Sequence, residues 1–378
     1  MARGPILIAG GGIGGVSAAV ALRQRGFDAV VFERAPALKE VGAGINVWPN
    51  ATHVLQQLGL LARAEAWPIH DVAFRHRTGR VLANTRPWAG GTPSLSFHRA
   101  DLLDLLVSAL PAEVVHLGHT VTGFTQEADG VRLHFEDGAE ATGTALIGAD
   151  GLRSRVRATL HGDEPPRYAG YPSWRGVALD TFPGYDEGKA SEVWGRGQWF
   201  GIFGLPGGRS FWYATDNLPE GGAAREPDPK AALLRRFAGW YDPVLRLIEA
   251  TPPEAILIND VYDRPPIRRW GRGRVTLLGD AAHPTTPNMG QGGCLALEDA
   301  LVLARCVEKQ PDDLPAAFRA YERKRWARTA RIVLESRGFG WMGQWAQPAL
   351  AALRDGVARV WPERLVSWAA APDYRYRA

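Results

Sequence analysis

The chain opens with an apolar run, a cluster of glycines and a helical pattern. Residues 5–9 are continuously apolar, residues 10–15 include five glycines, and residues 16–25 carry small and apolar side chains at helical spacing. A second apolar run, over residues 28–32, is followed by a glutamate. This order predicts a strand, a tight turn, a helix and a second strand parallel to the first, joined by a right-handed crossover.

Helices and strands alternate through the rest of the first half. Asn50 is expected to cap a helix that Gly59 terminates. The alternation over residues 72–83 breaks at Thr78-Gly79 and resumes, which predicts a hairpin, and leucine spacing predicts a helix over residues 99–110. Further short strands are predicted over residues 121–126, 131–135 and 145–149.

Between residues 168 and 216 the pattern changes to alternating aromatic and aliphatic side chains with many glycines. This predicts a second sheet, antiparallel and covered on one face. A helix pair interrupted near Pro243 is predicted over residues 230–249, and a buried strand over residues 274–278 precedes a helix over about residues 293–308. The chain is therefore expected to be an α/β protein with a parallel sheet, a second sheet and C-terminal helices.

Composition narrows the class of protein. The 378 residues are 46% hydrophobic and 22% charged, values typical of a folded globular chain of about two domains. The net charge is +4, with basic and acidic residues interspersed, so nothing indicates a nucleic-acid partner. Cys294 and Cys306 are twelve residues apart in one predicted helix, about 18 Å along its axis, which excludes a disulfide between them. With no leader-like or membrane-spanning run, we expect a reducing, cytoplasmic location.

The glycine cluster has the spacing of a dinucleotide-binding turn. Gly10, Gly12 and Gly15 form Gly-x-Gly-x-x-Gly between the first strand and the first helix, where glycines let the backbone approach a pyrophosphate. Glu33, at the end of the second strand, can accept both hydroxyls of an adenosine ribose, which favours FAD or NAD over NADP. The alternative is a glycine-rich turn beside a solvated glutamate.

Two later segments extend this pattern. Residues 145–157 read as a strand, an Asp150-Gly151 turn and the basic start of a helix, and residues 273–284 read as a strand followed by Gly279-Asp280. Glycines at 290, 292 and 293 then open the next helix. Together with the first turn, over about residues 5–335, these segments strongly resemble the FAD-dependent aromatic hydroxylases, the single-component flavoprotein monooxygenases. The closest likeness is to urate, salicylate and hydroxybenzoate hydroxylases.

The resemblance implies a Rossmann-like FAD-binding domain of the p-hydroxybenzoate hydroxylase kind, with an inserted, mostly antiparallel substrate domain. It implies that Asp280 accepts a ribitol hydroxyl, that the helix starting near Gly292 directs its dipole at the flavin ring, and that Arg99 contacts FAD, although Arg99 also suits a plain surface position. The implied cofactor-binding residues are Gly10, Gly12, Ile13, Gly14, Gly15, Glu33, Arg34, Ala43, Gly44, Arg99, Val121, Asp150, Asp280, Pro287, Gly290, Gly292 and Gly293.

The resemblance also implies the chemistry. NADH or NADPH reduces the flavin without a Rossmann domain of its own, O₂ adds to give a C4a-hydroperoxide, and one oxygen atom passes to an aromatic or polycyclic small molecule. Such flavin-driven chemistry needs few protein acids or bases, and the sequence contains no nucleophile elbow and no metal-ligand spacing. His283 and His53 are expected to be structural. The alternative is a reductase-type or non-catalytic FAD-binding protein of the same fold.

The substrate is expected to contact the sheet between residues 168 and 216. The candidates are Trp174, Trp199, Phe203, Phe211 and Tyr213, with Pro287 on the flavin side, although an aromatic sheet face is usually core. Arg175 is either a partner for a substrate carboxylate or a solvated arginine. Asn288 stands where a urate hydroxylase is expected to present an acid, and Trp199 where it is expected to present a base. A larger, more apolar ring than urate is therefore favoured.

The expected domain division is discontinuous. Residues 1–70, 98–165 and 270–335 are assigned to the FAD-binding domain, and residues 71–97 and 166–269 to the substrate domain. The tail, residues 336–378, carries Trp341, Trp345, Trp361 and Trp368 with aliphatic residues at helical spacing. This tail is expected to cover the FAD domain or a partner subunit, and a membrane-surface role is the less favoured alternative. The protein is expected to be a monomer or a homodimer.

Overall fold

A computed structural model describes residues 4–38, 43–87, 91–360 and 373–378. Its first layer is a five-stranded sheet in the order β18-β12-β1-β2-β8, with every pairing parallel. The three central strands are apolar and largely buried, as the short hydrophobic runs predicted. The strands are β1 (Ile6–Ala9), β2 (Ala29–Glu33), β8 (Val115–Leu117), β12 (Ala145–Gly148) and β18 (Val275–Leu277).

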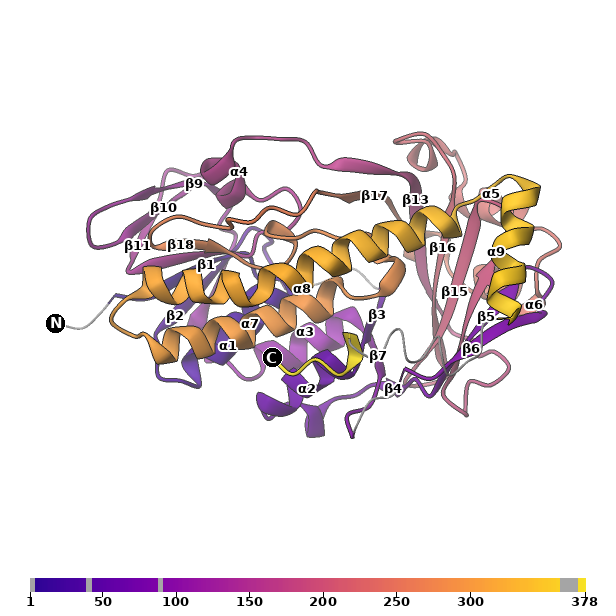
Figure 1. The fold of residues 1–378 in the computed structure, drawn as a ribbon, viewed down its shortest axis with the longest axis horizontal. Coiled ribbons are helices and arrows are strands. Elements are labelled where there is room, and N and C mark those ends of the chain that lie inside the picture. Colours follow the sequence, from indigo (N-terminus) through magenta and orange to yellow (C-terminus); the bar gives the residue numbers. More distant parts are fainter. Residues whose placement is uncertain (1–3, 39–42, 88–90, 361–372) are drawn as a thin grey trace.

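Helices lie against one side of this sheet, and a small antiparallel sheet lies against the other (Figure 1). The helices are α1 (Ile13–Arg23), α2 (Pro49–Gln57), α3 (Arg99–Val107) and α7 (Gly292–Lys309). The small sheet consists of β9 (Val121–Gln126), β10 (Val131–Phe135) and β11 (Glu140–Gly143), next to α4 (Arg155–His161). A further three-stranded sheet, of β3 (Gly44–Val47), β4 (Trp67–Pro68) and β7 (Leu95–His98), leads toward the second half of the molecule.

The second large sheet has seven strands in the order β17-β13-β16-β15-β14-β5-β6. Its pairings are antiparallel except for β14 with β5, so the expectation of a mostly antiparallel sheet is confirmed. The predicted hairpin over residues 72–83 supplies the last two strands. The seven strands are β5 (Asp71–His76), β6 (Val81–Thr85), β13 (Arg167–Ala178), β14 (Lys189–Trp194), β15 (Gln198–Leu205), β16 (Arg209–Asp216) and β17 (Leu257–Asp263).

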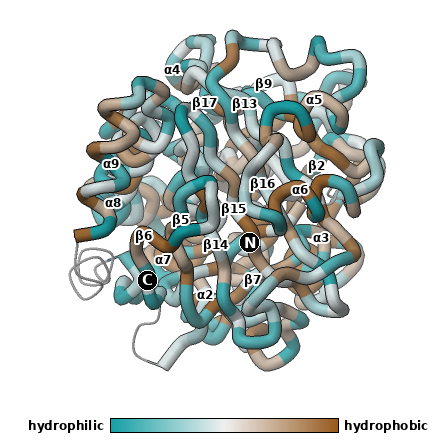
Figure 2. The backbone as a smooth tube through the Cα atoms, turned by 90° about the vertical axis from the view of Figure 1, so that its right-hand side faces the viewer, coloured by the Kyte–Doolittle hydropathy of each residue, from teal (hydrophilic) through white to brown (hydrophobic). Residues whose placement is uncertain are grey.

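The two faces of this sheet pack against different parts of the chain. On one face a core that includes Phe200 and Trp212 lies under α5 (Pro229–Arg236) and α6 (Asp242–Glu249), the predicted helix pair. The other face turns toward the parallel-sheet half of the molecule. Figure 2 views the molecule from the side of this sheet, with α8 and α9 beside β5 and β6.

The chain ends in two helices, α8 (Leu314–Gly343) and α9 (Pro348–Val360). The expected boundary between residues 335 and 336 falls inside α8, which runs unbroken from α7 to the seven-stranded sheet (Figure 1). The tail was expected to cover the FAD domain or a partner subunit, and within the described residues α9 packs on β6. The last residues do lie on the parallel-sheet half, where Arg328 in α8 donates to the carbonyl of Asp373 at 2.9 Å. Trp361 and Trp368 lie outside the described residues.

The expected cap at Asn50 is wrong. The helix begins one residue earlier at Pro49, whose fixed φ suits a first helical position, and Trp48 precedes it. The Asn50 amide instead donates to Glu298 at 2.6 Å and to Gln291 at 3.0 Å, which joins α2 to α7. Gly59 does end the helix region, with a φ of +71°.

Candidate active site

The glycine turn between β1 and α1 is packed on two sides and open on the third. A Cβ on Gly10, whose φ is +105°, would lie 2.4 Å from the carbonyl oxygen of Ala149, and one on Gly15 would lie 2.0 Å from the carbonyl oxygen of Gly10. A Cβ on Gly12 would meet nothing within 4 Å. The first and third glycines therefore allow strand and helix to approach closely, and the second leaves room for a diphosphate at the start of α1.

Glu33 lies directly beside this turn. Its Oε2 accepts a hydrogen bond from the Gly11 N–H at 2.7 Å, and its Oε1 accepts one from the Ala35 N–H at 2.9 Å. These bonds orient a half-buried carboxylate whose remaining lone pairs can accept ribose hydroxyls. Arg34 next to it is exposed. Val121 starts β9 two residues after His119, whose N–H donates to the Glu33 carbonyl.

The carboxylate of Asp150 is engaged by its own chain. It accepts hydrogen bonds from the Ser154 hydroxyl and from the backbone N–H groups of Arg155 and Val156, at 2.5, 2.7 and 3.2 Å. Burial raises the pKa of Asp150, and these bonds oppose the rise. Asp150 thus holds the start of α4 next to Gly10, so its first role is to shape the glycine turn.

Asp280 and Arg99 face each other across a hollow inside the protein. Asp280 is exposed to solvent although Gly279 and Ala281 on either side are buried. Burial of the site raises the pKa of Asp280, and the charges of His283 and Arg99 oppose the rise. The Arg99 N–H donates to the Ala43 carbonyl at 2.9 Å, which places the predicted residues Ala43 and Arg99 together.

The N-terminus of α7 opens on the same hollow. Gly292, its first residue, would place a Cβ 3.9 Å from Oδ1 of Asp280. A Cβ on Gly290, whose φ is +61°, would lie 2.8 Å from the Trp48 indole nitrogen, and one on Gly293 would lie 2.8 Å from Ile45. The Gly290 N–H donates to the Pro287 carbonyl at 2.8 Å, whereas Gly292 and Gly293 place backbone N–H groups at the positive end of the helix, which suits the oxygen-rich edge of an anionic flavin.

Buried ion pairs hold this helix in place. Asp299 accepts from the Gly279 N–H at 3.0 Å, from His283 Nε2 at 2.6 Å and from Arg325 Nε at 2.6 Å. His283 is buried and is thereby a structural partner of the loop that carries Asp280. The residues present fit FAD, because they provide an open glycine turn, a carboxylate beside it that can accept ribose hydroxyls, and a second carboxylate next to a helix start.

A cavity of about 700 Å³ lies between the N-terminal side of α7 and the seven-stranded sheet. Its lining comes from the sheet face that looks toward the parallel-sheet half, from the turn before α7, and from α8 and α9. The apolar lining residues include Val72, Phe74, Trp194, Trp199, Pro287, Phe339, Met342, Leu353 and Val357. Tyr213 and Glu192 supply polar groups from the sheet.

Some of the residues expected to form the substrate wall line this cavity, and others do not. Trp199, Tyr213 and Pro287 line the cavity. Trp174 does not line the cavity. It pairs with Ala214, the residue after Tyr213, and successive residues of a strand point to opposite faces of the sheet. The Trp174 indole therefore packs in the core under α5 and α6. The alternation of the strand decides this, and aromatic content alone does not reveal it.

Phe203 and Phe211 share the cavity side of the sheet but lie outside the cavity lining. Phe211 packs against Gly44, where a Cβ would lie 2.2 Å from its ring, so this pair closes the sheet onto β3. Arg175 donates to Asn259 at 2.5 Å, and burial and the nearby Arg99 lower its pKa. It therefore lies near the cofactor hollow and is not a freely solvated arginine.

Sequence reasoning missed Glu192, Trp194 and the residues of α8 and α9 in the cavity wall. Glu192 carried a usable signal, since it is the one acid in β14, where every residue after Lys189 is buried. No sequence signal pointed to Phe339 and Met342, because helical spacing does not indicate which sheet a helix will cover. No cluster of His, Cys, Asp or Glu suited to a metal occurs among the residues that the structure describes.

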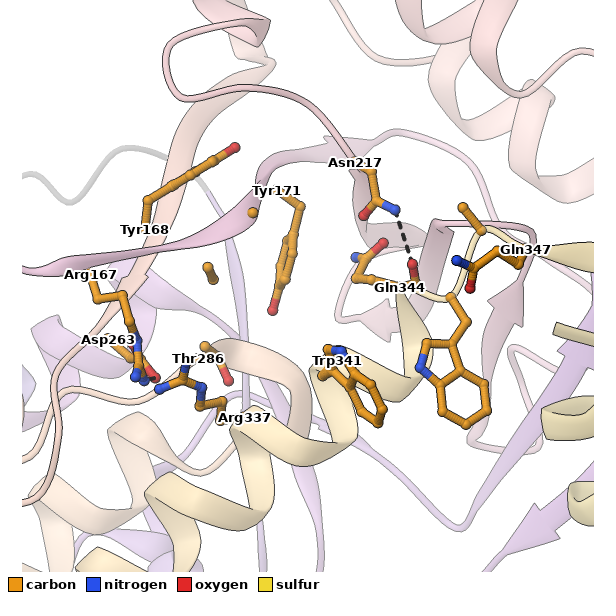
Figure 3. A pocket seen from close by; sticks show the side chains of 14 residues that line it. Arg167, Tyr168, Tyr171, Asn217, Asp263, Thr286, Arg337, Trp341, Gln344 and Gln347 are labelled. Atoms are coloured by element: carbon orange, nitrogen blue, oxygen red, sulfur yellow. Dashed lines mark hydrogen bonds and ion pairs between the residues drawn. The ribbon is translucent and has the colours of Figure 1, made fainter. Parts of the chain in front are cut away.

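A second, smaller cleft of about 430 Å³ lies on the other side of the 286–288 loop (Figure 3). Figure 3 shows Tyr171 pointing down between Tyr168 and Asn217, with Trp341 and Arg337 of α8 below. The Tyr171 hydroxyl donates to Asn288 at 2.7 Å. Since Asn288 lines the cavity and Tyr171 lines the cleft, this bond belongs to the wall between them.

Three features lie at the ends of strands of one parallel sheet. They are the open glycine turn after β1, Glu33 at the end of β2, and the Asp280 hollow after β18 at the start of α7. Together they define a dinucleotide-binding flavoprotein. Residues 3–336 match the model of the FAD binding domain family. The chain is 44% identical over 94% of its length to an aurachin C monooxygenase/isomerase of Stigmatella aurantiaca, covering 94% of that protein. It is 39% identical over 88% of its length to an FAD-dependent urate hydroxylase of Klebsiella pneumoniae, covering 88% of that protein.

Solved structures agree with this assignment. The structure of Klebsiella pneumoniae HpxO with FAD and uric acid superimposes with a TM-score of 0.90 at 33% identity, covering 98% of this chain and 96% of that one. The chain belongs to the FAD binding domain family. It is an FAD-dependent flavoprotein monooxygenase with a Rossmann-like domain and an inserted, mostly antiparallel sheet. Within the described ranges, every helix is too short or too polar to cross a membrane.

Proposed function

We propose that this enzyme uses NADH or NADPH and O₂ to oxygenate a large, mainly apolar aromatic or polycyclic molecule. The observation that carries the proposal is the cavity of about 700 Å³ with its aromatic and aliphatic walls, which include Pro287 and Gly290 in the turn before α7. Apolar walls bind a ring by excluding water and fix its orientation through few polar groups. The same walls keep water from the reacting groups.

We infer the cofactor contacts from where these groups lie in the structure. Glu33 binds the adenosine ribose, the turn at Gly12 binds the diphosphate, and Asp280 binds the ribitol. Bound FAD supplies the redox and oxygen-activating chemistry. The uncovered N–H groups at Gly292 and Gly293 stabilise negative charge on the ring edge, because they lie at the positive end of α7.

Urate is not the proposed substrate, although the chain resembles urate hydroxylases. Trp199 stands where we expected such an enzyme to present a base, and its indole N–H donates to the buried Glu192 carboxyl. Asn288 stands where we expected an acid and accepts from Tyr171. Arg86 and Arg354, the basic residues among the described lining, are both paired with aspartates and are not available for an anionic ring.

The experiment is a screen of the purified, flavin-loaded enzyme. Phenols, naphthols and fused heteroaromatic compounds are each tested for stimulation of NADH and NADPH oxidation and O₂ uptake, with urate alongside. The expected result is that a fused, apolar compound raises both rates and yields a product heavier by one oxygen atom. Stimulation by urate alone, or reduced flavin that never oxygenates any compound, would overturn the proposal.

We also infer a cytoplasmic location and a monomeric or homodimeric state. Both cysteines are free and buried, which suits a reducing compartment. Cell fractionation and size-exclusion chromatography with light scattering test these two inferences separately.

A further inference from the structure

Glu192 is a buried carboxyl in the cavity wall. It is in the middle of β14, is 8% exposed, and pairs across the sheet with Gly201 on one side and Phe74 on the other. Because Gly201 has no side chain, the ring of Tyr213 lies across it, where a Cβ would be 2.1 Å from the ring. The missing side chain thus lets Tyr213 reach Glu192 from the next strand but one.

Both hydrogen bonds to this carboxyl go to the same oxygen. Oε2 of Glu192 accepts from the Tyr213 hydroxyl at 2.5 Å and from the Trp199 indole N–H. Oε1 makes no hydrogen bond with any residue that the structure describes. A carboxylate oxygen in an apolar cavity without a donor is costly, so a ligand that supplies a donor there gains more than it would in water.

No cation neutralises Glu192 within the described residues. Arg354 of α9 is paired with Asp355, and Arg86 at the end of β6 is paired with Asp71. The other titratable groups in the wall are Glu335 of α8 and the segment Asp373-Tyr374, and both acids are paired with Arg331. Burial raises the pKa of Glu192 to about 7, and the Tyr213 and Trp199 donors oppose the rise.

We propose that Glu192 is the specificity-determining acceptor of the cavity: its Oε1 accepts a hydrogen bond from an N–H or O–H group on the substrate ring, and the cavity rejects substrates that bring a carboxylate to this point. This inference rests on the proposed function, because it assigns the substrate class of the same cavity. A neutral fused ring with one hydrogen-bond donor satisfies both the apolar walls and the free oxygen. An anionic ring meets a like charge and no available arginine.

The test compares 2-naphthol with 2-methoxynaphthalene, which have the same fused ring with and without a donor. Affinities for the FAD-loaded enzyme are measured by fluorescence titration, which needs no turnover. Wild type is expected to bind 2-naphthol more tightly, and the preference is expected to grow as the pH rises through about 7, because the ionised carboxylate is the better acceptor while the naphthol stays protonated. A hydroxynaphthoate, which adds a carboxylate, is expected to bind weakly.

The variant Glu192→Gln keeps an oxygen for Tyr213 and Trp199 but turns a donor toward the cavity. It is expected to weaken 2-naphthol binding roughly 10- to 100-fold while leaving 2-methoxynaphthalene within about 3-fold, the range for a hydrogen bond to a charged group. The control Asp216→Asn neutralises a carboxylate at the end of β16 that is paired with Arg236 of α5 and lies outside the cavity lining. It is expected to leave the ratio of the two affinities unchanged.

Several results separate the two proposals. Equal affinities of wild type for the naphthol and its methyl ether, or no binding of either, would overturn the role of Glu192, as would equal losses for both compounds in Glu192→Gln. The wild-type pH series gives this answer even if the variant fails to fold. Failure of the proposed function looks different, because the binding preference persists while no compound in the screen is oxygenated.

Discussion

Arg325 offers a sharp test of how α7 is held at the cofactor hollow. It is fully buried in α8 and forms ion pairs of 2.6 Å with Glu298 and with Asp299, both fully buried in α7. Asp299 also holds the Gly279 N–H and His283. Burial disfavours the charge on Asp299, but His283 and Arg325 outweigh it, so the pKa of Asp299 lies below its ordinary value. Replacing Arg325 by leucine removes the positive charge that is paired with the Glu298 and Asp299 carboxylates.

Removing one partner of a buried pair costs about 3–5 kcal/mol of unfolding free energy. We expect the lower end, about 3 kcal/mol, because Glu298 keeps Arg328 at 2.7 Å and Asp299 keeps His283. At roughly 2.1 cal/mol/K per residue, this corresponds to a fall in Tm of roughly 4 °C for the whole chain. FAD affinity should fall as well, because the loop that carries Asp280 loses its anchor.

The assay is thermal unfolding of Arg325→Leu and wild type, with and without FAD, followed by circular dichroism and by release of flavin fluorescence. Arg323→Leu is the matched control, since Arg323 is exposed on the same helix, and it should change the unfolding free energy by about 0.5 kcal/mol or less. If Arg325→Leu is as stable as the control and binds FAD normally, the buried pairs do not hold α7, and the reasoning is refuted.

Three further outcomes are expected. Gly15→Ala, which would place a Cβ 2.0 Å from the Gly10 carbonyl oxygen, should yield protein largely without flavin, seen in the ratio of flavin to protein absorbance; a normal ratio would contradict the packing argument. Glu33→Ala should weaken FAD binding roughly 10- to 100-fold in a fluorescence titration, since it removes hydrogen bonds to a charged acceptor, and unchanged affinity would place the ribose elsewhere. Tyr213→Phe removes a donor to Glu192, so the pKa of Glu192 should rise above about 7 and the midpoint of the 2-naphthol pH series should move upward; a midpoint that stays or falls would show that another group titrates.

The cofactor half was predictable because its signals are local. A buried strand, a glycine turn and an acidic residue follow one another within about thirty residues, and each is dictated by backbone sterics or by a charge at a strand end. Asp280 and Gly290–Gly293 repeat that logic at a second strand. The structure places Glu33 beside the first glycine turn and Asp280 beside the first residue of α7.

The substrate half was less predictable because its geometry depends on long-range pairing. The strand over residues 167–178 contains aromatic residues on both faces, and only its register with β16 shows that Trp174 points away from the cavity. The parallel pair of β14 with β5 joins segments more than a hundred residues apart. Likewise, nothing local in residues 348–360 indicates that this helix closes the cavity beside β6.

The unbroken α8 has a consequence for recombining enzymes of this family. Its 30 residues span about 45 Å, with Arg325 held against α7 in its first half and Phe339 and Met342 in the cavity wall near its C-terminal end. A chimera joined at residue 335 would have its junction inside a continuous helix and not in a flexible linker. Any rotational error at the junction would place the wrong side chains in the cavity. Exchanges that retain α8 and α9 with their native sheet, including β5 and β6, and place their junctions at residues 70 and 98 and near residue 166, would preserve that alignment.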